Sequence, residues 1–405
     1  MNNNFKRSVN GLTVSAGQAT KDHNWQQVQT PPGKKVLFVI DSLEMGGAET
    51  SLLENCSRFR KIEPVVCHIY QGDLLKAKFI ARGIKVYSIN LGAKYGFLRA
   101  YIKLLRVVLA EDPSLIVACL TRSELVARAV AITTKIPAVG CLVSDLYGTA
   151  YNQQLPRKAR LGVSFFKWLN KHTAGICRGF IANSAAIKLA GMQQLAIPAS
   201  AIEVIHRGRD KNLFAYHQRK ANDTTLRFLN IGRLVKLKGQ ADLVQAFTQF
   251  LTFRPDAVLQ IAGDGPCRAS LEQFISEYQL AGKVILAGNC NNLPELMPSF
   301  DCLLVASYSE GFSGVIVEAM MAGLPVIATD IPANREIITH LRTGFLFTAG
   351  SLIEMTAAMR WFTTNRTTAI EMAANARAYA VEHFELGVIA SRMEDYLYQL
   401  TPANT

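Results

Sequence analysis

Short runs of valine, isoleucine and leucine recur along the chain and alternate with longer segments of helical periodicity. In the first half these runs cover residues 36–40, 65–69 and 115–119, and in the second half 228–231, 257–261, 284–286 and 302–305. Apolar runs separated by crossover helices are typical of parallel sheets that are buried on both faces. The pattern predicts an α/β protein with two doubly wound parallel sheets.

The length of the chain, 405 residues, is sufficient for two domains that each have a core. Its apolar content of 49% is that of a globular protein. Residues 1–33 are polar and end in Pro-Pro-Gly, so we expect a flexible leader there. No apolar run approaches the roughly 18 residues of a membrane span, so we expect no integral membrane segment.

The net charge of +13 is concentrated in the first half. Residues 34–210 hold 25 Lys and Arg against 12 Asp and Glu, whereas residues 211–405 hold 16 against 18. Arg99, Lys103 and Arg106 share one face of a predicted helix. Its opposite side carries Leu98, Tyr101, Ile102 and Leu105. With the basic and aromatic stretch 157–168, this helix could bind an anionic membrane, although two crossover helices with charges facing water fit equally well. Nucleic acid is not favoured because no nucleic-acid-binding motif accompanies the charge.

The eight cysteines show no Cys-x-x-Cys pair and no zinc-ligand spacing, and several lie inside strand runs. They indicate buried thiols in a reducing compartment. We therefore expect a cytoplasmic protein, with the inner face of the plasma membrane as a further location.

Two glutamates, Glu310 and Glu318, flank a glycine turn that opens an apolar helix. Backbone N–H groups around residues 313–316 would lack helical partners and would favour a diphosphate at this helix end. Glu318, about one turn into the helix, could accept hydrogen bonds from a ribose diol, and Glu310 from hydroxyls of a second sugar. The alternative, two solvated surface charges, is less favoured because Glu318 lies within an apolar run.

Cationic side chains follow the first strand of the second half. Gly232, Arg233 and Lys238 come just after this strand's carboxyl end, where open α/β sheets bind ligands, and the two cations could face a diphosphate. A glycine turn at Gly263 follows the next strand and could border a nucleotide base. The first strand of the chain leads similarly into Gly46 and Gly47, which fit neither a dinucleotide nor a P-loop pattern. No Asp-x-Asp occurs, so we expect no metal site.

Taken in order, these motifs resemble the retaining glycosyltransferases of family 4, which have the GT-B fold. The resemblance rests on Gly-Gly-Ala-Glu at 46–49, Gly-Arg-Leu at 232–234, Lys-Gly at 238–239, Gly-Asp-Gly-Pro at 263–266 and Glu-Gly-Phe at 310–312 with Glu318. It implies two Rossmann-like domains facing across a cleft. Residues 34–210 would bind the acceptor, residues 211–385 would bind the donor, and a final helix in 386–405 would cross back onto the first domain.

The resemblance also implies roles for individual residues. Arg233 and Lys238 would hold the donor phosphates, Glu318 the ribose and Glu310 the transferred sugar. Phe312, Ser313, Gly314 and Val315 would contact sugar and phosphate, and Gly46 and Gly47 would lie beneath the diphosphate. The reaction would move a hexose-type sugar from a UDP- or GDP-sugar to a saccharide or lipid-linked acceptor, in surface polysaccharide, lipopolysaccharide or glycolipid synthesis, without cofactor or metal.

Two positions depart from the family pattern. Asp145 stands where the family often has a histidine, so it could replace that residue in catalysis or serve as a turn residue. The segment 206–210 reads His-Arg-Gly-Arg-Asp where the family usually has Pro-Asn-Gly-Val-Asp. Two rival functions stay open: a GT-B nucleotide-sugar epimerase, and a non-catalytic subunit that binds a sugar nucleotide.

Overall fold

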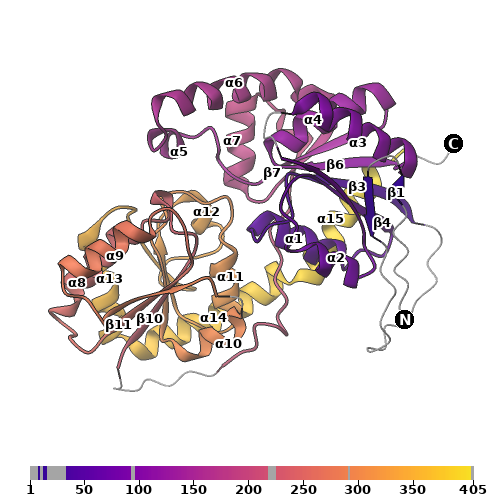
Figure 1. Cartoon of the computed structure of the whole chain (residues 1–405). Helices are drawn as coiled ribbons and strands as arrows, with labels where there is room; N and C mark the ends of the chain where they lie inside the picture. The colour runs from indigo at the N-terminus through magenta and orange to yellow at the C-terminus, as the bar shows by residue number, and fades with distance from the viewer. Residues whose placement is uncertain are drawn as a thin grey trace, which may run out of the picture. The chain divides into compact units, whose positions relative to one another are not determined.

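The computed structural model describes residues 8–9, 12–15, 33–92, 96–217, 225–290 and 292–402. The contacts divide the chain into two compact units, coloured along the chain in Figure 1. Unit 1 comprises Met1–Val143, Lys158–Gly208 and Leu386–Thr405, and unit 2 comprises Ser144–Arg157 and Arg209–Glu385. The segment 144–157, which the sequence suggested was part of the first domain, thus groups with unit 2 by its contacts.

Unit 1 is built on a parallel sheet in the order β5-β4-β3-β6-β7-β8-β9. Its strands are β3 (Lys34–Ile40), β4 (Ile62–Tyr70), β5 (Lys85–Leu91), β6 (Leu115–Cys119), β7 (Ala138–Leu142), β8 (Cys177–Ala182) and β9 (Ile202–Val204). Two short strands from the predicted leader, β1 (Ser8–Val9) and β2 (Leu12–Ser15), extend the β5 edge in antiparallel register. Most of the remaining leader lies outside the described residues.

Helices cover both faces of the unit 1 sheet. They are α1 (Gly47–Cys56), α2 (Lys76–Ala81), α3 (Phe97–Glu111), α4 (Thr121–Thr134), α7 (Ala185–Leu195) and α15 (Leu386–Leu400). A further helix, α6 (Arg157–Thr173), is hydrogen-bonded to α4. Alternate residues of β3 point to opposite faces. Phe38 packs in a core with α1, α2 and α15, whereas Val39 packs in a second core with α3 and α4.

Unit 2 repeats this design with six parallel strands in the order β12-β11-β10-β13-β14-β15. They are β10 (Arg227–Ile231), β11 (Val258–Ala262), β12 (Val284–Gly288), β13 (Cys302–Val305), β14 (Val326–Thr329) and β15 (Phe345–Phe347). The helices of its main segment are α8 (Gln240–Leu251), α9 (Arg268–Glu277), α10 (Leu293–Leu296), α11 (Gly314–Met321), α12 (Pro332–Arg335), α13 (Leu352–Thr364) and α14 (Arg366–Phe384), and α5 (Thr149–Gln153) lies in its segment 144–157.

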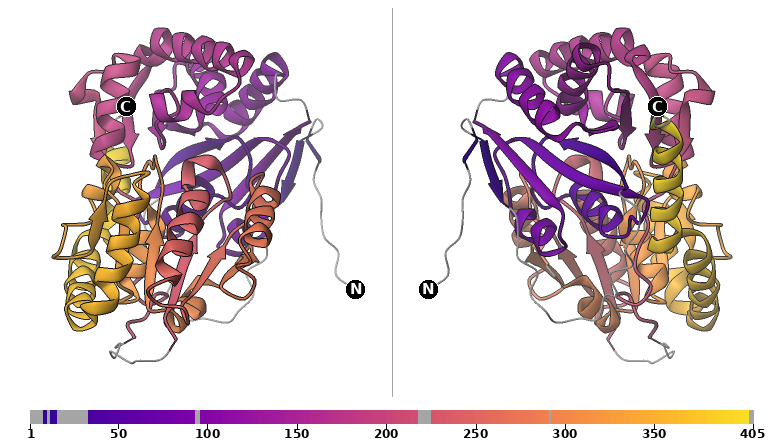
Figure 2. Two further views of the ribbon diagram at one scale, coloured as in Figure 1. Left: turned by 90° about the vertical axis from the view of Figure 1, so that its left-hand side faces the viewer. Right: turned by 90° about the vertical axis from the view of Figure 1, so that its right-hand side faces the viewer.

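The cores of unit 2 also lie on both sides of the sheet. Phe228 of β10 packs with α8, α9 and α13, and its neighbour Leu229 packs on the other side with α11 and α14. Figure 2 shows the helices flanking each sheet from two further directions. The prediction of an α/β protein with two doubly wound parallel sheets is confirmed.

The predicted apolar face of α3 is only partly correct. In α3, Ala100, Leu104 and Val107 are the buried positions, while Leu98 and Ile102 are 72% and 42% exposed. Tyr101 and Leu105, which belong to the same predicted face, are partly buried against this core, so the packed stripe includes only part of that face. Among the described helices, none has the length and hydropathy of a membrane span.

Candidate active site

The loop after β10 brings Lys238 toward the loop after β13. A 3-10 helix over Lys236–Lys238 ends at Gly239, whose φ of 64° lies in the left-handed region that glycine adopts without strain. A Cβ atom at Gly239 would lie 2.2 Å from the backbone oxygen of Ala306, just beyond β13. Glycine is therefore required for the close approach of these two loops at the carboxyl edge of the sheet.

Lys238 and Glu310, both predicted site residues, form an ion pair there. The Lys238 Nζ atom lies 2.5 Å from Glu310 Oε1, and the two side chains are 28% and 11% exposed. The Ser307 hydroxyl donates to the same carboxylate oxygen at 2.7 Å, and Thr329 donates to the Ser307 carbonyl at 2.7 Å. The carboxylate is thus held by side chains from two loops, beside a cation that could contact a phosphate.

The predicted glycines Gly232 and Gly263 lie next to this pair. A Cβ atom at Gly232 would be 3.7 Å from Lys238 Cδ, and one at Gly263 would be 2.0 Å from the Gly232 carbonyl oxygen. Gly263 therefore lets the loops after β10 and β11 pack backbone to backbone. Arg233 follows Gly232 with an exposed side chain, and its carbonyl accepts a hydrogen bond from Gln240 Nε2 at 3.3 Å.

The residues around the start of α11 are mostly buried. Phe312 is 2% exposed and its ring packs against Phe384, with ring centroids 5.4 Å apart. Ser313 is the N-cap of α11 and is 3% exposed, and its hydroxyl has no hydrogen-bond partner within the described chain. Val315 is partly buried against the same core. Phe312 thus anchors the loop, and only backbone or polar atoms of this segment are suited to a phosphate.

Glu318 is paired with an arginine that sequence reasoning did not assign to the site. Arg209 Nε donates to Glu318 Oε1 at 2.5 Å, and the two side chains are 7% and 11% exposed. Arg209 belongs to the segment 206–210 that departs from the family pattern, where it replaces the usual valine. That departure was the sequence signal available, but which carboxylate it would meet depended on the tertiary structure.

In unit 1, Gly46 and Gly47 begin α1 and lie against charged side chains. A Cβ atom at Gly46 would be 2.2 Å from Glu49 Oε2, and one at Gly47 would be 2.6 Å from the Nη1 atom of Arg207. Burial raises the pKa of Glu49, and the nearby Arg207 opposes this shift. The two glycines allow an acidic and a basic side chain to approach the helix start closely.

Asp145 lies in a turn just after β7. Its carbonyl accepts a hydrogen bond from the Gly148 N–H at 3.3 Å, and a Cβ atom at Gly148 would lie 2.0 Å from Asp145 Oδ2. The carboxylate is therefore folded over its own turn ahead of α5. This geometry matches the turn role that the sequence left open, while a catalytic role for Asp145 stays a prediction.

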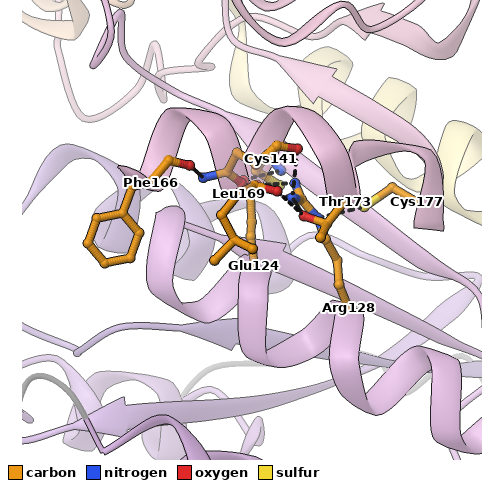
Figure 3. Close-up of polar contacts among 8 residues, drawn as sticks. Glu124, Arg128, Cys141, Phe166, Leu169, Thr173 and Cys177 are labelled. Atoms are coloured by element: carbon orange, nitrogen blue, oxygen red, sulfur yellow. Dashed lines mark hydrogen bonds and ion pairs between the residues drawn. The ribbon is translucent and has the colours of Figure 1, made fainter. Parts of the chain in front are cut away.

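A network of buried polar side chains in unit 1 includes a hydrogen bond from the Cys141 N–H of β7 to Glu124 (Figure 3). Arg128 is 1% exposed, and its Nη2 atom donates to Glu124 at 2.7 Å. Its Nη1 atom donates to Asn170 Oδ1 at 2.8 Å and to the Thr173 hydroxyl at 2.9 Å. Burial raises the pKa of Glu124 to about 7, against the opposing effects of Arg128 and of the Cys141 N–H. This network joins α4 to α6 and to β7.

Family models match both halves of the chain. The model described as "Glycosyltransferase Family 4" covers residues 45–213, and the model described as "Glycosyl transferases group 1" covers residues 215–380. The chain belongs to the family 4 glycosyltransferases and has the GT-B fold. Membership places it among the transferases.

The chain is also similar to individual proteins. The chain is 30% identical over 172 residues to N-acetyl-alpha-D-glucosaminyl L-malate synthase of Bacillus anthracis, a stretch that covers 42% of this chain and 45% of that protein. It is 24% identical to UDP-Gal:alpha-D-GlcNAc-diphosphoundecaprenol alpha-1,3-galactosyltransferase of Escherichia coli, over 65% of this chain and 70% of that one. Anabaena Alr3699/HepE in complex with UDP superimposes with a TM-score of 0.76 at 25% identity, over 90% of this chain and 100% of the other.

Proposed function

We propose that this protein is a retaining glycosyltransferase that moves a hexose-type sugar from a nucleotide-diphosphate sugar to an acceptor hydroxyl. The proposal rests on the ion pair between Lys238 and Glu310 at the carboxyl edge of the unit 2 sheet. Glu310 lies four residues before the first residue of α11. A cation, a hydrogen-bonded carboxylate and unpaired helix N–H groups are the set that a pyrophosphate-linked sugar needs. The UDP found with Anabaena Alr3699/HepE supports a UDP- or GDP-sugar as donor.

In the proposed reaction, the bond between the sugar's anomeric carbon and the diphosphate oxygen breaks while a bond to the acceptor oxygen forms on the same face. The acceptor proton passes to the departing phosphate oxygen, so no protein nucleophile is required. Lys238, Arg233 and the N–H groups of α11 stabilise the negative charge that develops on the diphosphate. Glu310 orients the sugar through its hydroxyls. Roles for Gly46, Gly47 and Asp145 in donor binding and catalysis stay predictions from the sequence.

Donor binding is the first test of this proposal. A nucleotide sugar that binds the native state is expected to raise the melting temperature, because binding at 100 times Kd adds about 2.7 kcal/mol to the unfolding free energy. A thermal-shift screen of UDP-, GDP-, ADP- and dTDP-sugars is expected to give one responsive base. The shift should persist in EDTA, since the sequence lacks an Asp-x-Asp motif. No shift with any donor would contradict the proposal, and conversion of the donor without an acceptor would indicate an epimerase.

The proposed acceptor is a saccharide or a lipid-linked saccharide of surface polysaccharide, lipopolysaccharide or glycolipid synthesis. The diphosphoundecaprenol in the name of the Escherichia coli relative supports a lipid-linked acceptor. Such an acceptor would require the enzyme to work at a membrane surface. Together with the eight cysteines, which form no disulfide, this supports the cytoplasmic face of the plasma membrane as its location.

A surface on α6 supports the membrane contact. Leu161, Phe165 and Trp168 are spaced along one face of this helix and are 74%, 58% and 55% exposed. Lys158, Arg160 and Lys171 flank them and are exposed as well. The ring of Phe166 lies 6.3 Å from that of Phe97, which brings α6 beside α3 with its exposed Leu98. Exposed apolar side chains with basic neighbours are suited to an anionic lipid surface.

Replacing Phe165 and Trp168 with serine is expected to abolish co-sedimentation with vesicles that contain anionic lipid at low salt. The reason is that the apolar side chains would insert into the lipid surface, while each basic side chain adds about 1 kcal/mol of attraction to the anionic lipid. Ile353→Ser, which removes an 81% exposed apolar side chain in unit 2, serves as the control and should leave binding unchanged. Absence of wild-type binding at every ionic strength would reject the membrane contact.

A further inference from the structure

We propose that Arg209 is a donor-positioning residue that links Glu318 to the diphosphate at the start of α11. The proposal rests on the function proposed above, and it assigns to that donor site a cation outside the motif residues. Arg209 occupies the position where the resembling family usually has valine, so this contact is a property of this chain.

The geometry places the guanidinium along the first turn of α11. Its Nε atom donates to Glu318 Oε1 at 2.5 Å. Its Nη2 atom lies where a side chain on Gly314 would be, only 2.1 Å from the position of a Cβ atom. Gly314 is the first residue of α11 and Glu318 is one turn later. The guanidinium therefore extends from the Glu318 carboxylate to the helix start, and glycine at 314 leaves the room for it.

The start of α11 has a second feature that indicates a ligand. Ser313 is 3% exposed, and its hydroxyl is unpaired among the described residues. Because a buried hydroxyl without a partner costs free energy, an acceptor oxygen at this point would be favourable. In the first helical turn, the Ile316 N–H donates to the Ser313 carbonyl at 3.2 Å, whereas the N–H groups of Gly314 and Val315 lack partners within the helix. A phosphate oxygen there would meet hydroxyl, N–H and guanidinium donors together.

Arg209 is held in place by its backbone. Its N–H donates to the Phe384 carbonyl at 2.9 Å, and the residue forms a β-bridge with Glu385. Phe384 in turn packs on Phe312, the residue that anchors the α11 loop. The main chain of Arg209 and the donor loop are therefore fixed to the same residue, which limits the positions that the guanidinium can reach. Glu318 can serve a ribose hydroxyl while it retains the arginine.

The test compares Glu318→Gln with the double variant Arg209→Val/Glu318→Gln, since neither leaves an unpaired buried carboxylate. Isothermal titration with UDP, UMP and uridine, or with the guanosine series if the wild-type protein binds GDP, separates phosphate from nucleoside contacts. Adding Arg209→Val is expected to lower the affinity for the diphosphate by about 10- to 100-fold. The affinity for the monophosphate should fall by less, and that for the nucleoside by less than about twofold. In the wild-type background, Arg209→Lys should retain much of the diphosphate affinity because it keeps the charge.

Arg335→Val is the matched control, because it removes an exposed arginine that is paired with Asp330 in the same unit. It should change none of the three affinities. An equal loss of affinity for the diphosphate and the nucleoside, or no loss of affinity, would show that Arg209 only neutralises Glu318. That result would overturn this inference and leave the proposed function standing. A wild-type protein that binds neither UDP nor GDP would overturn the inference together with the proposed function.

Discussion

Replacing Lys238 with alanine is expected to lower kcat by about 100- to 1000-fold, the range seen when one preorganised donor to a developing negative charge is removed. The Nζ atom of Lys238 is fixed by Glu310 at 2.5 Å, so its charge is already oriented before the donor binds. Binding of the ground-state donor should weaken much less than turnover, since the charge on the leaving diphosphate grows in the transition state.

The measurement is steady-state kinetics with the donor found by the thermal-shift screen, together with the melting temperature of each variant. Lys236→Ala is the matched control, because Lys236 begins the same 3-10 helix and its side chain is exposed. It should retain kcat. Glu310 keeps its hydrogen bond from Ser307 in the Lys238 variant, so the fold should persist. An unchanged kcat for Lys238→Ala would remove this residue from the proposed mechanism.

The second large effect concerns stability. Arg128→Met is expected to reduce the unfolding free energy by about 3–5 kcal/mol at pH 8, because it leaves the buried Glu124 carboxylate without its cation. It also removes the donors to Asn170 and Thr173 that join α4 to α6 (Figure 3). The double variant Arg128→Met/Glu124→Gln should recover part of the loss, since no buried charge is left.

The loss of unfolding free energy caused by Arg128→Met should depend on pH. Burial raises the pKa of Glu124 from 4.5 to about 7, so the folded protein retains this proton over a pH range in which the unfolded chain has released it. The contribution of Glu124 to stability is therefore largest below about pH 4.5 and declines as the pH rises toward 7. At pH 5 the Glu124 carboxyl is protonated, and Arg128→Met should cost less than at pH 8.

Urea unfolding at both pH values measures these differences. Arg392→Met is the control in the same unit, since Arg392 pairs with Glu203 at 3.4 Å and both side chains are about half exposed. Its cost should stay within about 1 kcal/mol at either pH. An equal cost for the buried and exposed arginines would show that the network contributes little to stability.

The site illustrates why sequence spacing and tertiary structure give different information. Glu310 and Lys238 could be singled out because each follows a recognisable strand, and parallel strands place their carboxyl ends at one edge of a sheet. Arg209 could not be assigned in this way, because it lies between strands and its carboxylate partner is 109 positions away. Of the apolar face predicted for α3, Tyr101 and Leu105 are packed while Leu98 and Ile102 are exposed, because apolar residues occupy more than one face of that helix.

By itself, the sequence determined the class of the fold, the alternation of strands and helices, and the glycines and charged residues that end the strands. These features depend on periodicity and on local backbone requirements, which are encoded within a few neighbouring residues. Only the tertiary structure decided which charges meet. Buried groups such as Glu318 and Arg209, or Glu124 within its network, take their partners from whatever the packing brings within hydrogen-bonding distance. Their energies depend on burial, which no local pattern specifies.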